Sequence, residues 1–281
     1  MPGEGLAIVA GRGALPRLIA EDCRRQGRPY RVVRLDGVAL DWAGEHPLID
    51  AVLEKPGRLF ADLRRAGCGT VTFAGGVRRP ELDPRRFDLT MLRLAPRLIA
   101  GMRGGDDGTL RLIAGIFEAE GFVVRAPHEL LSDLVMPAGG LTRARPSPAD
   151  RADAARAAAI TAALGMVDTG QGAVVAQGIC LGLESIQGTD AMLDFVARTG
   201  ADFRPDPAGA RGVLYKAPKP GQDWRLDLPA IGPDTIARAA AAGLAGVAVQ
   251  AGGVLLVGRD ETIAAADAAG LFLWGREPDL P

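Results

Sequence analysis

Lysine, histidine and cysteine are all scarce in this chain. Of 33 lysines and arginines in 281 residues, the lysines are only Lys55, Lys216 and Lys219. His46 and His128 are the only histidines, so no Ser-His-Asp or Cys-His arrangement follows from the sequence. The 3 cysteines are far apart and lack zinc-ligand spacing. This pattern predicts a reducing compartment and no structural metal.

The charges nearly balance, and we expect neither a leader segment nor a membrane span. The formal net charge of -1 provides no general attraction for nucleic acid, so we expect no nucleic-acid partner and only a local site for any anionic ligand. The first residues show no basic stretch followed by a long apolar one, and we expect no signal peptide. Residues 239–258 carry no charge, but glycines interrupt them. They predict a helix end, a buried strand, a Gly-Gly turn and another strand, in a cytoplasmic protein.

Alternating strand and helix patterns fill the first half of the chain. The composition, 48% hydrophobic and 24% charged, is that of a globular chain with a buried core. Apolar strand patterns cover residues 6–10, 30–35, 70–76 and 122–126, and helical patterns cover 14–27, 58–67, 89–102 and 106–121. Alternation of this kind predicts an α/β fold, here a Rossmann-like parallel sheet in an N-terminal nucleotide-binding domain over residues 1–135.

A second α/β domain is predicted after a short linker. Residues 136–150 are dense in glycine, proline and serine, as in a linker or exposed crossover. A helix over 148–165, with Ser147 or Asp150 as its cap, opens the C-terminal domain over residues 151–281. A long strand or hairpin over 172–184 and helices over 188–199, 234–243 and 260–270 follow. We therefore expect two α/β domains joined by a linker.

Two glycine turns in the first domain are candidate anion sites. "VAGRGALP" (9–16) passes from a strand into a helix through Gly11 and Gly13, and "FAGGVRRP" (73–80) leaves another strand of the same sheet. Ligands of such sheets gather at the carboxyl ends of the strands, and a helix start presents N–H groups to an anion. Asp36 ends the second strand, but Pro16 occupies the third glycine position of a dinucleotide fingerprint. A turn that only connects elements is the alternative.

Further polar candidates follow in loops. Asp106 and Asp107 in "GGDDGTL" (104–110) suit either a helix cap or a Mg²⁺ ligand. In "DTGQGAVVAQG" (168–178) and "ESIQGTDAM" (184–192), neutral donors come from Gln171 and Gln187. Oxygen ligands come from Glu184, Thr189 and Asp190, although the last two also suit a helix cap.

Two of the three lysines stand in "LYKAPKPGQDWRLDLPAIG" (214–232). Its prolines predict a stiff hairpin turn from which Lys216 and Lys219 meet phosphate oxygens as point charges. Asp227 lies between two leucines, and we expect it beside the lysines as phosphoryl transfer requires. An edge hairpin with an exposed polar face is the alternative.

These motifs resemble, in order and almost end to end, those of one family. The chain is similar to the UDP-2,3-diacylglucosamine pyrophosphatases of the LpxI type, which act in lipid A biosynthesis in Gram-negative bacteria. The matching stretches are "GLAIVAGRGALP", "FAGGVRRP", "GDDGTL", "GQGAVVAQG", "ESIQGTDAML", "KAPKPGQDWRLDLPAIG" and "AGLAGVAVQAGGVLLV". Two departures are Arg12, where the family more often has glycine, and Gly76, where it often has asparagine.

The resemblance implies a Mg²⁺-dependent hydrolase that cleaves the substrate's pyrophosphate to UMP and 2,3-diacylglucosamine 1-phosphate (lipid X), with water attacking the α-phosphorus. It also implies a lipid substrate held between two domains, peripheral contact with the inner leaflet, and an essential aspartate that falls on Asp227. Lys216 and Lys219 would neutralise phosphate charge, and the metal ligands would be Asp227, Asp190 and Glu184. The implied substrate contacts are Gly11, Arg12, Gly13, Ala14, Gly75, Gly76, Val77, Arg79, Gln171, Gly172, Gln187, Gly188, Thr189 and Gln222.

Two other functions are compatible with the sequence. An NAD-type oxidoreductase fits the first domain, but the missing third glycine and the absence of a catalytic histidine pair count against it. A non-catalytic nucleotide-binding module would leave Lys216, Lys219 and Asp227 without a chemical task. Homodimerisation is also open.

Overall fold

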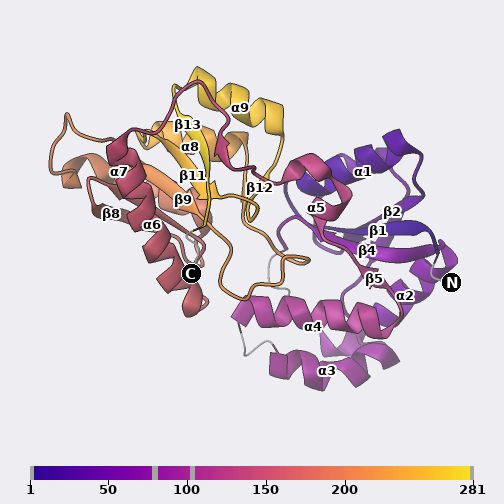
Figure 1. Cartoon of the computed structure of the whole chain (residues 1–281). Helices are drawn as coiled ribbons and strands as arrows, with labels where there is room; N and C mark the ends of the chain where they lie inside the picture. The colour runs from indigo at the N-terminus through magenta and orange to yellow at the C-terminus, as the bar shows by residue number, and fades with distance from the viewer. Residues whose placement is uncertain (1–2, 78–81, 102–104, 279–281) are drawn as a thin grey trace. The chain divides into compact units, whose positions relative to one another are not determined.

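The chain forms two compact α/β units. The computed structural model describes residues 3–77, 82–101 and 105–278 (Figure 1). One unit comprises Met1–Ser132 together with Asp223–Asp227, and the other comprises Asp133–Gln222 together with Leu228–Pro281. The predicted fold class, two α/β domains with a Rossmann-like parallel sheet in the first, is confirmed.

The first unit is a doubly wound parallel sheet. In the described residues its five strands have the order β3-β2-β1-β4-β5, and all neighbouring pairs are parallel. The strands are β1 (Gly5–Ala10), β2 (Tyr30–Leu35), β3 (Leu48–Ala51), β4 (Cys68–Ala74) and β5 (Val123–Val124). The helices are α1 (Leu15–Gln26), α2 (Pro56–Arg65), α3 (Leu89–Gly101), α4 (Gly105–Ala119) and α5 (Pro127–Leu130), with short 3-10 turns η1 (Ala43–Glu45), η2 (Pro84–Arg86) and η3 (Ser132–Leu134).

Both faces of this sheet are buried. Every residue of β1 is buried, with Leu6 and Ile8 packing on the side of α1 and Ala7 and Val9 on the side of α2 and α4. Such two-sided burial explains why the strands read as continuous apolar runs. Because the chain winds outward from β1 in both directions, the strand order reverses between β1 and β4. A doubly wound sheet places its ligands at this switch point.

The second unit has a mixed sheet of six strands among the residues described, in the order β6-β13-β11-β9-β7-β8. The strands of this sheet are β6 (Gly139–Gly140), β7 (Gly172–Ala176), β8 (Ile179–Leu183), β9 (Val213–Lys216), β11 (Gly246–Gln250) and β13 (Phe272–Arg276). A separate parallel pair joins β10 (Ala230–Ile231) to β12 (Leu255–Leu256). The helices are α6 (Pro148–Met166), α7 (Gly188–Phe203), α8 (Pro233–Ala241) and α9 (Arg259–Ala268).

Helices cover both faces of this second sheet. On one face, residues of α7, α8 and α9 such as Leu193 and Ile236 form a single cluster with the strands. On the other face, α6 contributes Ala154 and Ala157, whose small side chains let the helix approach the strands closely. Ser147 caps α6 through a reciprocal capping box with Asp150.

Three segments differ from the sequence-based expectations. The strand β3 was not predicted, because Leu48–Ala51 is short and has no clear alternation. Residues 136–150 lie in the second unit, where β6 pairs with β13 and Met136 is fully buried in the core. The expected C-terminal domain over 151–281 is also interrupted, because residues 223–227 belong to the first unit.

The predicted hairpin over 214–232 is wrong. The chain leaves β9 at Lys216, makes turns, and re-forms a strand only at β10, which pairs with β12 and not with β9. The prolines and glycines after Lys216 therefore make a long connection between different elements. The uncharged stretch 239–258 runs from α8 through β11 to β12, as expected, and no helix in the described residues is long and apolar enough to cross a membrane.

Candidate functional site

Two glycine turns meet at the switch point of the first sheet. After β1, Arg12 donates its backbone N–H to the carbonyl of Gly76 at 2.8 Å, and Gly76 donates back to Arg12 at 3.1 Å. A Cβ on Gly11 would stand 2.6 Å from the Gly75 carbonyl oxygen, and one on Gly75 would stand 2.4 Å from that of Arg12. Gly75 also has a φ of +84°. The two turns can therefore touch only because both positions are glycine.

The helix after the first turn starts without a side-chain cap. Ala14 precedes α1 and offers no oxygen to the first N–H groups of the helix. Gly13, with a φ of +97°, and Val77 are exposed beside this helix start. Exposed backbone donors at a helix N-terminus can hold a phosphate group. Arg79, expected to add a cation here, lies outside the described residues.

A cleft of about 540 Å³ opens at the carboxyl ends of β2 and β3. Asp36 lines it at the end of β2, and its carboxylate accepts a hydrogen bond from Arg86 at 3.0 Å. Lys55 and Arg58 also line the cleft. Charged and apolar side chains line the cleft in equal number, and it neighbours the Gly11 turn because residues 30–34 of β2 pair with β1.

In the second unit, Lys216 is buried among polar groups. Its side chain is only 6% exposed, and its Nζ donates to the hydroxyl of Thr189 at 2.6 Å. The Glu184 Oε2 atom is 3.6 Å from the same Nζ and, among the described residues, has no hydrogen-bond partner. Lys216 ends β9, Glu184 follows β8 and Thr189 lies in the first turn of α7. Three elements thus fix one ammonium group.

Gly172 makes room for this cluster. It pairs with Lys216 across β7 and β9, and its carbonyl accepts the Glu184 N–H at 2.9 Å. A Cβ there would stand 2.5 Å from Glu184 Oε2. Gln171, the preceding residue, accepts the Ala217 N–H through its carbonyl at 3.0 Å. The two expected contacts Gln171 and Gly172 are therefore built into the strand pairing that positions Lys216.

Lys219 has a carboxylate partner that the sequence interpretation missed. Its Nζ lies 2.5 Å from Asp168 Oδ1, and its backbone N–H donates to the buried side chain of Gln222 at 2.9 Å. Asp168 has a φ of +52°, which is uncommon outside glycine. In the sequence, only the position of Asp168 ahead of Thr169 and Gly170 in a glycine-rich turn could have suggested this role.

The expected metal ligands are not gathered into one set. Asp190 forms an ion pair with Arg238 at 3.6 Å and is mostly exposed, whereas Glu184 faces Lys216. Across residues 3–77, 82–101 and 105–278, no group of three or more histidine, cysteine, aspartate or glutamate side chains is placed to hold a metal ion. Gln187 donates to the Leu183 carbonyl at 2.9 Å and Gly188 has a φ of +80°, so both shape the turn into α7.

Asp227 belongs to the first unit. The segment Asp223–Asp227 is anchored there by Leu226, which packs into the core cluster under α4, and by Arg225, which donates to Glu118 and Asp223 at 2.7 Å each. The Arg225 guanidinium lowers the pKa of the Asp223 carboxyl through its hydrogen bond. The expectation that Asp227 lies in the C-terminal domain with the lysines is thus corrected.

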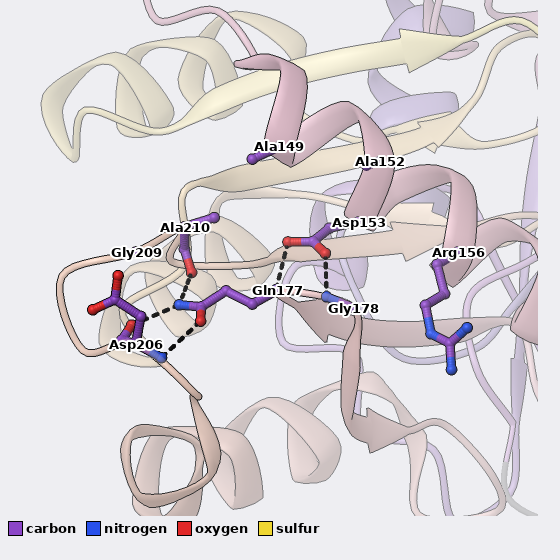
Figure 2. Close-up of a pocket in the computed structure, with 9 residues that line it drawn as sticks. All are labelled: Ala149, Ala152, Asp153, Arg156, Gln177, Gly178, Asp206, Gly209 and Ala210. Atoms are coloured by element: carbon purple, nitrogen blue, oxygen red, sulfur yellow. Dashed lines mark hydrogen bonds between the residues drawn. The ribbon is translucent and has the colours of Figure 1, made fainter.

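A second hollow of about 540 Å³ in the second unit serves the fold (Figure 2). Figure 2 shows Asp153 of α6 pointing at the β7–β8 turn, where its carboxylate accepts the N–H groups of Gln177 and Gly178 at 2.8 and 2.7 Å. The Gln177 side chain bonds Asp206 and Ala210 in turn. These polar groups hold the β7–β8 turn in place. The turn lies at the end of β7 opposite to Gly172.

His46 has a structural role. Its Nδ1 is 2.6 Å from the Tyr30 hydroxyl, and its ring packs edge-on against Trp42. Burial lowers the pKa of His46 below its ordinary value. The histidine is therefore a neutral part of the core, which leaves the oxidoreductase alternative without a catalytic role for it.

Comparison with known proteins assigns the chain to a family. The LpxI N-terminal domain profile matches residues 5–134, and the LpxI C-terminal domain profile matches residues 137–274. The chain belongs to the LpxI family. It is similar to the UDP-2,3-diacylglucosamine pyrophosphatase LpxI of Caulobacter vibrioides, with 42% identity over 273 residues that cover 97% of this chain and 98% of the relative. The two glycine turns lie within the residues that the N-terminal profile matches. Lys216, Lys219 and their carboxylate partners lie within the residues that the C-terminal profile matches.

Proposed function

We propose that this LpxI-family chain hydrolyses the pyrophosphate bond of UDP-2,3-diacylglucosamine in lipid A biosynthesis, giving UMP and 2,3-diacylglucosamine 1-phosphate. The observation that carries the proposal is the similarity to the Caulobacter enzyme of that name, which extends over 97% of the chain. In the reaction, a water oxygen bonds to the α-phosphorus, the bond from that phosphorus to the bridging oxygen breaks, and the lipid phosphate leaves with that oxygen.

Lys216 and Lys219 are the proposed phosphate-neutralising groups. Each is held in place by a carboxylate, Glu184 for Lys216 and Asp168 for Lys219. An ammonium group has three donors, so one can hold a phosphate oxygen while the others keep their protein partners. Such fixed positive charge stabilises the negative charge that develops as the phosphoryl bond breaks.

Asp227 is the proposed catalytic carboxylate. It orients the attacking water or contributes a ligand to Mg²⁺; both roles require an ionised side chain. Asp190 and Glu184 fit a metal poorly, since Arg238 and Lys216 respectively face them. A single aspartate together with substrate phosphate oxygens is, however, a common way to hold Mg²⁺. Bound in this way, Mg²⁺ would supply positive charge to the pyrophosphate oxygens.

The glycine turns of the first unit are the proposed nucleotide contacts. The exposed Gly13 and the uncapped start of α1 offer N–H donors to an anion without a lysine, whereas Arg12 and Gly76 donate their N–H groups to each other and hold the two turns together. The proposal requires these groups, Asp227 and the two lysines to act on one substrate molecule. We also propose that the enzyme works in the cytoplasm at the inner leaflet, because its substrate carries two acyl chains.

The test is the release of UMP from UDP-2,3-diacylglucosamine with and without Mg²⁺. We expect UMP only with Mg²⁺, and Asp227→Ala should lower the rate by at least about 100-fold while the thermal transition stays cooperative. Asp190→Asn is the matched control, because it removes a carboxylate paired with Arg238, and its rate should remain within about threefold of wild type. Wild-type turnover by Asp227→Ala would contradict the assigned role of that residue.

A further inference from the structure

The helix α3 presents apolar side chains to solvent along one face. Leu89, Leu92 and Ile99 are 74%, 55% and 60% exposed, although Met91 of the same helix is buried and Leu94 and Leu98 pack against the core. Leu89, Leu92 and Ile99 follow helical spacing, with the exposed Pro96 between them. They form a stripe about 15 Å long on the outside of the unit, where α3 runs beside α4 (Figure 1). An exposed apolar stripe of this kind marks an interaction surface.

Arginines flank this stripe. Arg93 and Arg97 are exposed and, at helical spacing, fall on the same outward half of α3. Neither forms an ion pair with a carboxylate in the described parts of the chain. From Leu89 to Ile99 the sequence contains no acidic residue. The outward face of α3 therefore combines apolar side chains with uncompensated positive charge.

We propose that this α3 face, defined by Leu89, Leu92, Arg93, Arg97 and Ile99, docks on the surface of an anionic lipid bilayer. A helix lying in the membrane interface buries its apolar side chains among the acyl chains while arginines at its flank bind lipid phosphates. The inference rests on the proposed function, because an enzyme with a two-chain lipid substrate gains from contact with the bilayer that holds it. It adds the surface through which that contact is made.

A second copy of the chain fits this face less well. A symmetric dimer through α3 would bring the arginines of both copies together, and the helix offers no carboxylate between Leu89 and Ile99 to offset them. A single bound acyl chain also fits poorly, since the stripe is the outer surface of a helix rather than an enclosed cavity. A broad anionic surface complements both the apolar stripe and the arginines.

The test is co-sedimentation of the full chain with phosphatidylcholine vesicles, with and without about one third phosphatidylglycerol. We expect binding to the anionic vesicles that weakens as salt is added. Replacing Leu89, Leu92 and Ile99 together by glutamine should weaken binding by at least about 10-fold. Arg93→Gln with Arg97→Gln should weaken it by about 25-fold, or about fivefold for each charge.

The matched control is Phe195→Gln with Phe203→Gln. These phenylalanines of α7 are 48% and 63% exposed, so the substitutions remove apolar surface elsewhere on the chain, and binding should be unchanged. The proposal is overturned if wild type does not bind anionic vesicles, if the α3 variants bind as wild type does, or if the control weakens binding equally. It is also overturned if the α3 variants convert a dimer to a monomer in sedimentation, since a second copy would then cover the face.

A parallel assay separates this proposal from the proposed function. UMP release from detergent-dispersed substrate does not require a bilayer, so the α3 variants should retain the wild-type rate there. If no sample releases UMP, the proposed function has failed, while the vesicle measurements still decide whether α3 docks on lipid.

Discussion

Glu184→Gln should destabilise the second unit by removing the charge that compensates Lys216. The two side chains are 12% and 6% exposed, with Glu184 Oε2 3.6 Å from Lys216 Nζ. At an effective dielectric constant of about 20, charges at this distance attract by about 5 kcal/mol before desolvation is counted. Removing one member of a buried pair costs about 3–5 kcal/mol, because the other charge stays buried without compensation. Glutamine keeps the shape and can still accept a hydrogen bond, so we expect about 3 kcal/mol.

A double-mutant cycle isolates this interaction. Lys216→Met alone leaves the Glu184 carboxylate buried, and we expect a loss in the free energy of unfolding similar to that of Glu184→Gln. The double variant removes both charges and should be more stable than the sum of the single effects predicts, by about 2 kcal/mol. Urea unfolding near neutral pH provides all four values. If the single effects add to within about 0.5 kcal/mol, the pair is not coupled and the reasoning is refuted.

Kinetics on the same variants separate a positioning role for Glu184 from a metal-ligand role. If Glu184 positions Lys216, Glu184→Gln lowers the rate of UMP release, and adding Mg²⁺ does not restore it. If Glu184 instead binds the metal, the Mg²⁺ concentration needed for half-maximal rate rises, and excess Mg²⁺ recovers activity. The second result would return Glu184 to the ligand role that its sequence position suggested.

Three further predictions concern single residues. Gly75→Ala should weaken UMP binding by at least about 10-fold in calorimetry, because its Cβ would collide with the Arg12 carbonyl; Gly121→Ala, at a φ of +89° in open space, is the control and should bind UMP normally. Asp153→Ala should cost about 2–4 kcal/mol in urea unfolding, because two half-buried N–H groups lose their acceptor, and a wild-type midpoint would contradict this. His46 has a lowered pKa, so the folded protein resists its protonation, and stability should fall as pH decreases from about 6.5. His46→Gln should flatten that decline, and an unchanged pH profile would argue against the assignment.

Much of the fold follows from the sequence because its strands are buried on both faces. β1 and β4 read as largely apolar runs, and glycines such as Gly27 end helices, so each of these elements was visible locally. β3 was missed because four residues at a sheet edge carry too little pattern. The segment 214–232 was misread because proline-stiffened chain is consistent with both a hairpin and a long connection. Only the pairing of β10 with β12 distinguishes the two.

The sequence predicted which residue types form the candidate site, but not which side chains pair with one another. At Gly11, Gly75 and Gly172, neighbouring chain segments come so close that a Cβ atom would collide with them. Which carboxylate meets which cation depends on how β8, β9 and α7 converge. Glu184 and Asp190 were expected as metal ligands from their carboxylate oxygens and from the family resemblance. The structure pairs them with Lys216 and Arg238 instead. The placement of residues 223–227 in the first unit depends on long-range packing of Leu226, which no local pattern reports.

The most direct test of the central claim is turnover of UDP-2,3-diacylglucosamine by the wild-type chain in water enriched in heavy oxygen. Mass spectrometry of both products then locates the new oxygen atom. We expect UMP that carries the heavy oxygen in its phosphate and an unlabelled 2,3-diacylglucosamine 1-phosphate, as attack at the α-phosphorus requires. Label confined to the lipid phosphate would contradict the assigned point of attack, and the absence of UMP with Mg²⁺ present would contradict the proposed function itself.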